Sequence, residues 1–301
     1  MREKDRMGAA WHAGTPLLTP WASMRTRLPT TSAAIVLSLA LCACQHAAPA
    51  TAEAGSATQP RVLLLGEVHD NAAGHAARAA LLRRQVEAGW RPAIAMEQFD
   101  TGQQESLDAA MASCADAQCV VAKAAPAKSS WTWPYYTEVI ALALQHDLPL
   151  LAANLSRADA SKVVKDGFAV ALPDALVARY ALANLPADVL AAQEAEVRDS
   201  HCGMLPEPMV SPMAKAQIAR DVVMADTMRT HAANGVVLIA GNGHVRGDIG
   251  VPYWLRRDGL QARSVGFLEP AAGANAFDQV ERIPAADRAD PCAGYKAPKP
   301  G

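Results

Sequence analysis

The sequence predicts an α/β domain: a mostly parallel β-sheet flanked by helices, with a site at the carboxyl ends of the strands. Short, wholly apolar runs alternate with longer segments of helical periodicity. This pattern is typical of strands that helices bury on both faces. Ionisable and amide side chains follow several of these runs, whereas plain turn residues precede them. Because ligands bind at the carboxyl ends of strands in such sheets, the asymmetry indicates a functional edge.

Length and charge limit the classes of protein that remain. The chain has 301 residues, of which 51% are hydrophobic, and its formal net charge is −2. This length allows one domain of roughly 200 residues plus its ends. The near-neutral charge and the lack of a basic run argue against nucleic acid as a partner.

The amino-terminal segment has the pattern of an export signal that starts at Met24. Arg25 and Arg27 precede an apolar run over 33–41, which ends in small residues and cysteine. The run is too short to cross a bilayer as a helix of the mature protein. We therefore predict a signal peptide over 1–44, with Met24 as the true start.

The sequence "LCAC", which ends at Cys44, resembles a bacterial lipobox. The resemblance implies cleavage before Cys44, lipidation of its sulfur by an acyl chain such as palmitate, and a lipid-anchored protein of the cell envelope. Gln45 after the acceptor favours the outer membrane, facing the periplasm. An ordinary cleaved signal with an incidental cysteine is the alternative. Residues 45–60 are small, polar and proline-bearing, which predicts a flexible tether.

Export would make disulfides possible. Beyond the lipobox the chain has four cysteines, Cys114, Cys119, Cys202 and Cys292, which allow three pairings. We favour a local Cys114–Cys119 bridge and a Cys202–Cys292 bridge that fixes the tail. A cysteine-rich metal site is the weaker alternative, because there is no second close pair.

The main domain is expected over 61–270. The expected strands are "RVLLLG", "PAIAMEQF", "LPLLAANL", "GVVLIAGNGH" and "ARSVGFLEP". The expected helices are 73–88, a helix from 102 to the cysteine loop, 135–146, a helix-rich stretch over 157–200 broken at Pro173 and Pro186, and 211–234 with Ser211 as its cap and Pro212 in its first turn. Residues 271–301 lack periodicity, so we expect an extended tail.

The residues just past the strands predict the site. Glu67 and His69 follow the first strand, Glu97 ends the second, Asn154 ends the third and His244 follows the fourth. Parallel strands deliver their carboxyl ends to one edge of the sheet, so these side chains should converge there. Helix capping would explain an acid after the first strand, but not an acid and an imidazole together. An ion pair with arginine is the alternative for Glu97.

Three further polar residues are candidates for supporting roles. His75 leads the apolar line of the first helix, so it should point over the same edge; a core histidine bonded to a backbone carbonyl is the alternative. Gln217 and Asp221 flank the long helix, where a surface or ion-pair stripe is the alternative.

The motifs together resemble the ChaN family of bacterial haem-binding lipoproteins, within the superfamily of Tiki proteases, TraB proteins and erythromycin-esterase-like enzymes. The resemblance covers 61–270 in the expected order. The motifs are "LLGEVHDN", "AMEQFD", "WTWPYYTEVIALALQHDLPLLAANLSR", "DSHCGMLP", "SPMAKAQIARDVVMADTM" and "IAGNGHVRGDIGVP".

The resemblance implies haem as the cofactor, with two haems packed face to face across a homodimer, and outer-membrane haem uptake components as partners in iron acquisition or haem handling. Tyr136, in the "W-x-W-x-x-Y" pattern, and its neighbour Tyr135 are candidate phenolate ligands, and His201 is a candidate imidazole. Arg157 and Arg246 are candidate donors to the propionates. A helix anchor with a surface hydroxyl is the alternative role of Tyr136.

The chain departs from the family pattern at two positions. Thr132 replaces the Asp of "WDW", and Met204 stands where the family often carries a His. The second departure weakens the case for a His-rich ligand loop.

The enzymes of the superfamily imply a different function, a periplasmic hydrolase of esters or peptides. Glu67, His69, Glu97 and His244 would then be catalytic. Glu67, His69 and His244 would hold a divalent metal, or one of the set would act as a base on water. A serine hydrolase is not indicated, because no Gly-x-Ser-x-Gly elbow is present.

Overall fold

The structure is a computed structural model that describes residues 61–126, 129–290 and 292–294. The predicted signal peptide, the lipidation site Cys44 and the tether over 45–60 lie outside the described residues. No helix in the described ranges has the length and apolar character needed to span a membrane.

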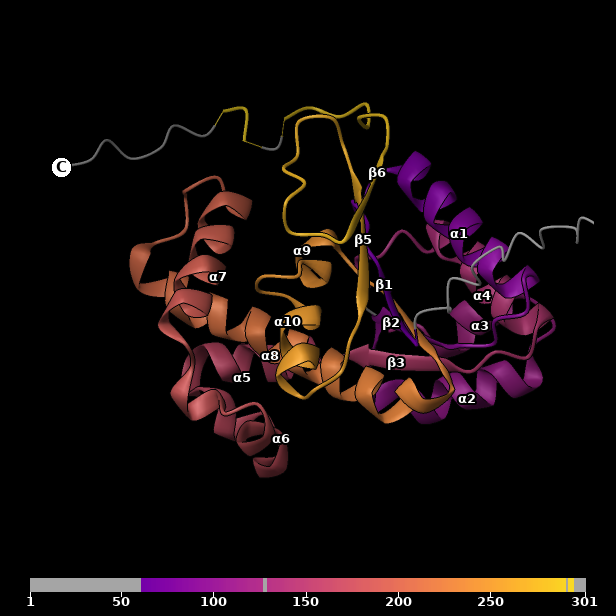
Figure 1. The fold of residues 1–301 in the computed structure, drawn as a ribbon, viewed down its shortest axis with the longest axis horizontal. Helices are drawn as coiled ribbons and strands as arrows, with labels where there is room; N and C mark the ends of the chain where they lie inside the picture. The colour runs from indigo at the N-terminus through magenta and orange to yellow at the C-terminus, as the bar shows by residue number, and fades with distance from the viewer. Residues whose placement is uncertain (1–60, 127–128, 291, 295–301) are drawn as a thin grey trace, which may run out of the picture. The chain divides into compact units, whose positions relative to one another are not determined.

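A fully parallel sheet forms the centre of the domain (Figure 1). Within the described ranges it has six strands in the order β3-β2-β4-β1-β5-β6. The strands are β1 (Val62–Leu65), β2 (Ala93–Asp100), β3 (Leu150–Asn154), β4 (Val236–Ile239), β5 (Arg263–Leu268) and β6 (Gln279–Arg282). The predicted α/β class is confirmed, and the first five strands lie where the apolar runs predict them.

Helices cover both faces of the sheet. One face carries α1 (Ala72–Glu87), α2 (Gln104–Ser113), α3 (Ala117–Ala124) and α4 (Thr137–Gln145). The other carries α5 (Arg157–Asp166), α6 (Asp174–Arg179), α7 (Ala187–Ser200), α8 (Glu207–His231), α9 (Asn242–Val245) and α10 (Val251–Arg257). Short 3₁₀ turns occupy Thr101–Gln103, Trp133–Tyr135, Phe168–Val170, Leu182–Asn184 and Ala232–Asn234.

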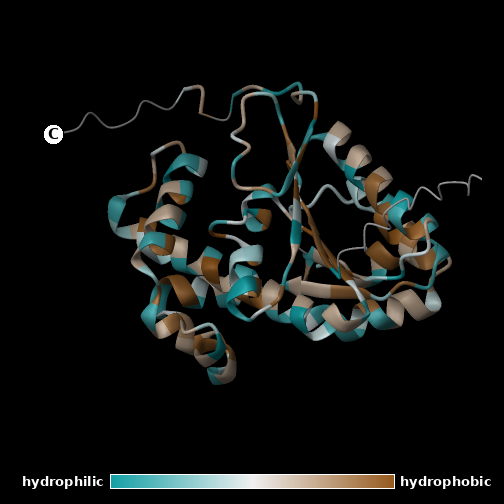
Figure 2. Cartoon of the chain, in the orientation of Figure 1, coloured by the Kyte–Doolittle hydropathy of each residue, from teal (hydrophilic) through white to brown (hydrophobic). Residues whose placement is uncertain are grey.

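Alternate residues of each strand enter two separate cores. Leu63 and Leu65 of β1 pack with α1 to α4, whereas Val62 and Leu64 pack with the helices of the other face. The period-two alternation of strand side chains sends apolar residues to both faces, so the central strands are apolar throughout. In Figure 2 the central strands are mostly brown, and the helices carry both teal and brown segments.

The strand order places topological switch points between β2 and β4 and between β1 and β5. The chain leaves β2 toward β3 through α2 to α4 on one face, whereas it leaves the neighbouring strand β4 toward β5 through α9 and α10 on the other. These two connections diverge, and the crevice outside the carboxyl ends of such a pair of strands is the usual ligand position in these sheets.

Three sequence expectations needed correction. The cysteine loop contains a helix, α3. The tail contains an edge strand, β6, which was not predicted because "QVER" is half-exposed and has no apolar run. The long helix does not start with Ser211 at its cap. Instead α8 begins at Glu207, with Pro206 at the cap and Pro208 in the first turn, and Pro212 lies inside the helix.

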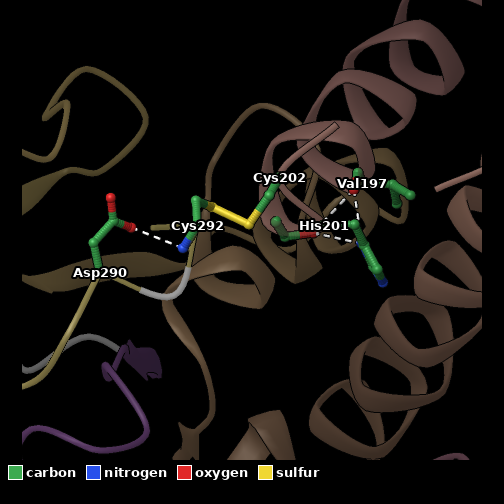
Figure 3. Close-up of a disulfide and its surroundings, with 6 residues drawn as sticks. Val197, His201, Cys202, Asp290 and Cys292 are labelled. Atoms are coloured by element: carbon green, nitrogen blue, oxygen red, sulfur yellow. Dashed lines mark hydrogen bonds between the residues drawn. A yellow bond between two sulfur atoms is a disulfide. The ribbon is translucent and has the colours of Figure 1, made fainter. Parts of the chain in front are cut away.

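The two predicted disulfides are present. Cys114–Cys119 closes the connection between α2 and α3. Cys202–Cys292 joins the turn after α7 to the tail (Figure 3). The second bridge spans 90 residues of sequence and encloses everything from α8 to β6.

The tail is also fixed at the carboxyl end of β5. The Glu269 carboxylate accepts hydrogen bonds from Asn71 Nδ2 (2.8 Å), the backbone N–H of Ala286 (3.0 Å) and both terminal nitrogens of Arg288 (2.8 and 2.9 Å). The Arg288 hydrogen bonds, with those from Asn71 and Ala286, lower the pKa of Glu269 to about 2. Asn71 is the cap of α1, so this carboxylate connects the tail to the start of that helix.

Candidate functional site

The site is built around Glu67, which follows β1 and has a fully buried side chain. Its Oε1 accepts a hydrogen bond from the Tyr136 hydroxyl at 2.6 Å and lies 2.8 Å from His69 Nδ1. Its Oε2 forms an ion pair with Arg78, a fully buried residue of α1. The guanidinium compensates the buried carboxylate, which would otherwise be very costly to desolvate.

His75 contacts this cluster through both of its ring nitrogens. A guanidinium only donates, so His75 Nδ1 accepts the hydrogen bond from Arg78 Nη2 at 3.0 Å. The proton therefore sits on His75 Nε2, which donates to the backbone carbonyl of His69 at 3.1 Å. Burial lowers the pKa of His75, which agrees with this neutral tautomer. His75 thus points toward the predicted edge and also bonds a backbone carbonyl.

Aromatic rings line one side of the cluster. The His69 ring meets Trp131 edge-on at 5.0 Å, and the His75 ring stacks on Tyr135 at 4.6 Å. Tyr136 lies under these rings and is fully buried, and Trp131 packs edge-on against it at 5.8 Å. Burial raises the pKa of Tyr136 above its usual range. The aromatic patch and the strand-end cluster therefore form one site.

A second cluster of polar side chains lies at the carboxyl ends of β2 and β4. His244 Nδ1 is 2.6 Å from Asp221 Oδ1, and His244 Nε2 is 3.5 Å from Glu97 Oε1. Glu97 Oε2 accepts a hydrogen bond from the backbone N–H of Gly241 at 2.8 Å. Asp221 therefore comes from the flank of α8 into the site.

The charges of this cluster affect the pKa values of Asp221 and His244. Burial raises the pKa of Asp221 to about 6, although the imidazolium of His244 opposes the shift. Burial disfavours the imidazolium, but the charges of Glu97 and Asp221 and the hydrogen bond with Asp221 outweigh it, raising the pKa of His244 to about 9. His244 is therefore an imidazolium at neutral pH.

Gly241 brings the two groups together. A Cβ at this position would lie 3.0 Å from His69 Cε1, 3.1 Å from His69 Nε2 and 3.7 Å from Glu97 Oε2. The His69 ring therefore packs against a backbone that has no side chain, close to the Glu97 carboxylate. Glu67, His69, Glu97 and His244 thus line one rim, hereafter the strand-end rim.

Two arginines complete the rim, and neither was predicted from the sequence. Arg220 Nη1 donates to Asn154 Oδ1 at 2.7 Å and to the Leu155 carbonyl at 2.8 Å. Asn154 Nδ2 in turn donates to the Glu97 carbonyl at 2.9 Å. Arg78 had a signal in the sequence, because it interrupts the apolar stripe of α1; Arg220 had none.

The other residues that the sequence predicted for the site do not take part in these contacts. His201 Nδ1 is 2.8 Å from the Val197 carbonyl at the end of α7, beside the disulfide (Figure 3). Arg157 is exposed at the start of α5, and Gln217 is half-buried on α8. Arg246 is paired with Glu196 at 2.6 Å and with a neighbouring carboxylate.

An open cavity of about 440 Å³ lies at the same edge of the sheet, next to the end of β5. Its lining includes Asn242, Arg246, Leu268 and Phe277. In the part of the chain that the structure describes, no group of three His, Cys, Asp or Glu residues has the arrangement that holds a metal ion.

The charge on His244 predicts how stability depends on pH. Its folded-state pKa, about 9, lies above the ordinary value of 6.5, so its contribution is complete below pH 6.5 and is lost as the pH rises through 9. We expect the free energy of unfolding to fall by on the order of 3 kcal/mol across this window, as measured by urea denaturation. In His244→Gln this decline should disappear; an equal decline in the variant would contradict the assignment.

The fold and the site define an α/β domain with a polar, aromatic-lined rim at the switch point of a parallel sheet. The family model for "haem-binding uptake, Tiki superfamily, ChaN" matches residues 54–255. The chain belongs to this family.

The chain is also similar to solved structures. ChaN of Campylobacter jejuni, solved with cofacial haem, shares 20% identity over 73% of this chain and 86% of that one, with a TM-score of 0.62. This likeness shows a shared fold. An erythromycin esterase mutant, EreC in its open conformation, shares 17% identity over 70% of each chain, with a TM-score of 0.42. No curated protein matches the sequence significantly.

Proposed function

We propose that this protein binds haem at the strand-end rim. Membership of a haem-binding family is the observation that carries the proposal. The donors at the rim fit such a ligand. The His69 side chain is 55% exposed and lies next to the half-buried ring of Trp131, and the half-buried ring of Tyr135 stacks on His75. Haem is an apolar plate that needs flat apolar contacts, a nitrogen or oxygen donor for its iron, and cations for its propionates.

The cations near the rim differ in how free they are for propionates. Arg246 lines the cavity beside β5 but already holds Glu196 and Asp248, and these carboxylates raise its pKa. A propionate at Arg246 would therefore replace an existing carboxylate partner. Arg157 is exposed at the start of α5, shortly after the carboxyl end of β3, so its guanidinium is accessible to a propionate.

A titration with hemin tests the proposal. Mature protein should give a saturable Soret band that differs from that of free hemin, and iron-free protoporphyrin should bind more weakly because it lacks the axial bond. His231→Ala is a matched control, because His231 is an exposed imidazole near the amino end of β4, at the opposite edge of the sheet. Absence of a saturable band from the purified protein would refute haem binding.

We further propose a lipid-anchored protein of the outer membrane that faces the periplasm and handles haem for iron acquisition, working as a homodimer with outer-membrane uptake components. The lipobox at Cys44 supports the anchor. Incorporation of a labelled fatty acid tests it, and Cys44→Ser should abolish the label. Incorporation that persists in the variant would exclude this anchor.

A hydrolase is the second candidate, and one contact favours it. The Asp221–His244 hydrogen bond, with Glu97 facing the other imidazole nitrogen, resembles the oriented acid–base groups of hydrolytic sites. An ester substrate should then be turned over, and His244→Gln should abolish the turnover. Equal turnover by wild type and variant would exclude this role.

A further inference from the structure

The two outer strands of the sheet in the described part of the chain differ in sequence. β6 contains Glu281 and Arg282, and charged side chains are a common means of keeping an edge strand from pairing with another protein. β3, with the sequence "LLAAN", has only buried residues and no charge. An apolar, uncharged edge is a site at which copies of a protein pair and aggregate, so β3 needs protection of another kind.

A glutamine side chain is hydrogen-bonded to the outer edge of β3. The Pro149 carbonyl accepts from Ile94 of β2, so the next carbonyl, that of Leu150, faces away from β2. Gln104 Nε2 donates to this Leu150 carbonyl at 3.0 Å, and Gln104 Oε1 accepts from the Ala152 N–H at 2.7 Å. These are the two groups that one residue of a further parallel strand would bond, so the side chain takes the place of such a residue.

The partners of Gln104 determine the orientation of its amide. The Ala152 N–H only donates, so it faces the amide oxygen. The Leu150 carbonyl and the Asp108 carboxylate, which lies 2.8 Å from Nε2, only accept, so they take the two amide hydrogens. All polar atoms of the side chain therefore have partners, and these contacts hold the amide against the strand.

There is space for another chain segment beside this edge. An open cavity of about 480 Å³ lies against residues 149–152. Gln104 and Asp108 line it from the side of α2, and Thr227 and Thr230 line it from α8. Without the Gln104 side chain, the Leu150 carbonyl and the Ala152 N–H would face this space.

We propose that the Gln104 side chain occupies the pairing position of a further strand and thereby keeps the β3 edges of two copies of this chain from joining. A second copy is the partner that this contact excludes, because two identical uncharged edges approach each other without charge repulsion. The inference does not depend on haem binding, whose proposed site is at the carboxyl ends of the strands.

The test replaces Gln104 with alanine in the full mature chain, without haem. Sedimentation velocity over a series of protein concentrations should show association of Gln104→Ala to at least twice the wild-type mass. Gln118→Ala, which changes an exposed glutamine of the neighbouring helix α3, is the matched control and should keep the wild-type mass. The comparison is relative to the wild type, so a homodimer formed elsewhere on the surface does not affect it.

A second variant separates an open edge from a general loss of stability. Gln104→Glu still accepts from the Ala152 N–H but cannot donate to the Leu150 carbonyl, and it places a charge at the edge. This variant should therefore keep the wild-type mass.

Hydrogen exchange reports on the edge itself. In dilute Gln104→Ala the Ala152 N–H should exchange at least about tenfold faster than in the wild type, because it has lost its acceptor. Protection of this N–H should return as the variant associates.

Three results would each overturn the proposal. The first is a wild-type mass for Gln104→Ala at every concentration. The second is equal association of Gln104→Ala and Gln104→Glu, which would indicate destabilisation instead of an opened edge. The third is unchanged exchange of the Ala152 N–H in Gln104→Ala, which would show that the side chain does not cover the strand.

Discussion

Replacing Arg78 with methionine is expected to lower the free energy of unfolding by about 3–5 kcal/mol. Arg78 is fully buried on α1 and pairs with Glu67, whose side chain is also fully buried. Methionine fills much of the space but leaves the carboxylate without its cation. The same change removes the donor that fixes the His75 ring, so His69 should also lose its fixed orientation. Chemical denaturation measures the loss.

Two comparison variants separate the effect of the unpaired buried charge from the effect of changing a residue of α1. Arg84→Met changes an exposed arginine of the same helix and should cost no more than about 0.5 kcal/mol. Glu67→Leu in the Arg78→Met background removes the unpaired carboxylate and should recover part of the stability, because a buried ion pair replaced by apolar groups is often nearly neutral. Equal losses from Arg78→Met and Arg84→Met would show that the buried pair contributes nothing.

The sequence predicted those features of the fold that depend on local pattern. Five strands are short apolar runs because helices bury them on both faces, and the first disulfide joins cysteines only five positions apart. The strand β6 was missed because it lies at the sheet edge, where half-exposed side chains remove the apolar signal. The start of α8 was missed because Ser211 and Pro212 resemble a helix start, whereas Pro208 sits in the actual first turn.

The site was only partly predictable for a similar reason. The carboxyl ends of parallel strands share one edge, so chain order alone places Glu67 and Glu97 near each other. The partners of these residues depend on three-dimensional packing. Nothing local indicates that Tyr136 turns its hydroxyl inward to Glu67, or that Arg220 reaches Asn154 from α8.

Replacing both Cys202 and Cys292 with serine is expected to lower the free energy of unfolding by about 4–5 kcal/mol. The bridge closes a loop of 90 positions, so its removal lets the unfolded chain gain the entropy of a long loop. The loop contains Asp221 of α8, His244 after β4 and the tail anchor Glu269 after β5.

The chain has its own control for this prediction. Cys114–Cys119 closes a loop of only five positions, so its double serine variant should lose about 2 kcal/mol by the same relation. Loop length is the main difference between the two bridges, and the larger loss should therefore follow the longer loop. Denaturation curves of both variants under the same conditions measure the difference. If the short bridge contributes as much as the long one, native contacts near the sulfurs, rather than the entropy of the unfolded chain, determine the stabilisation.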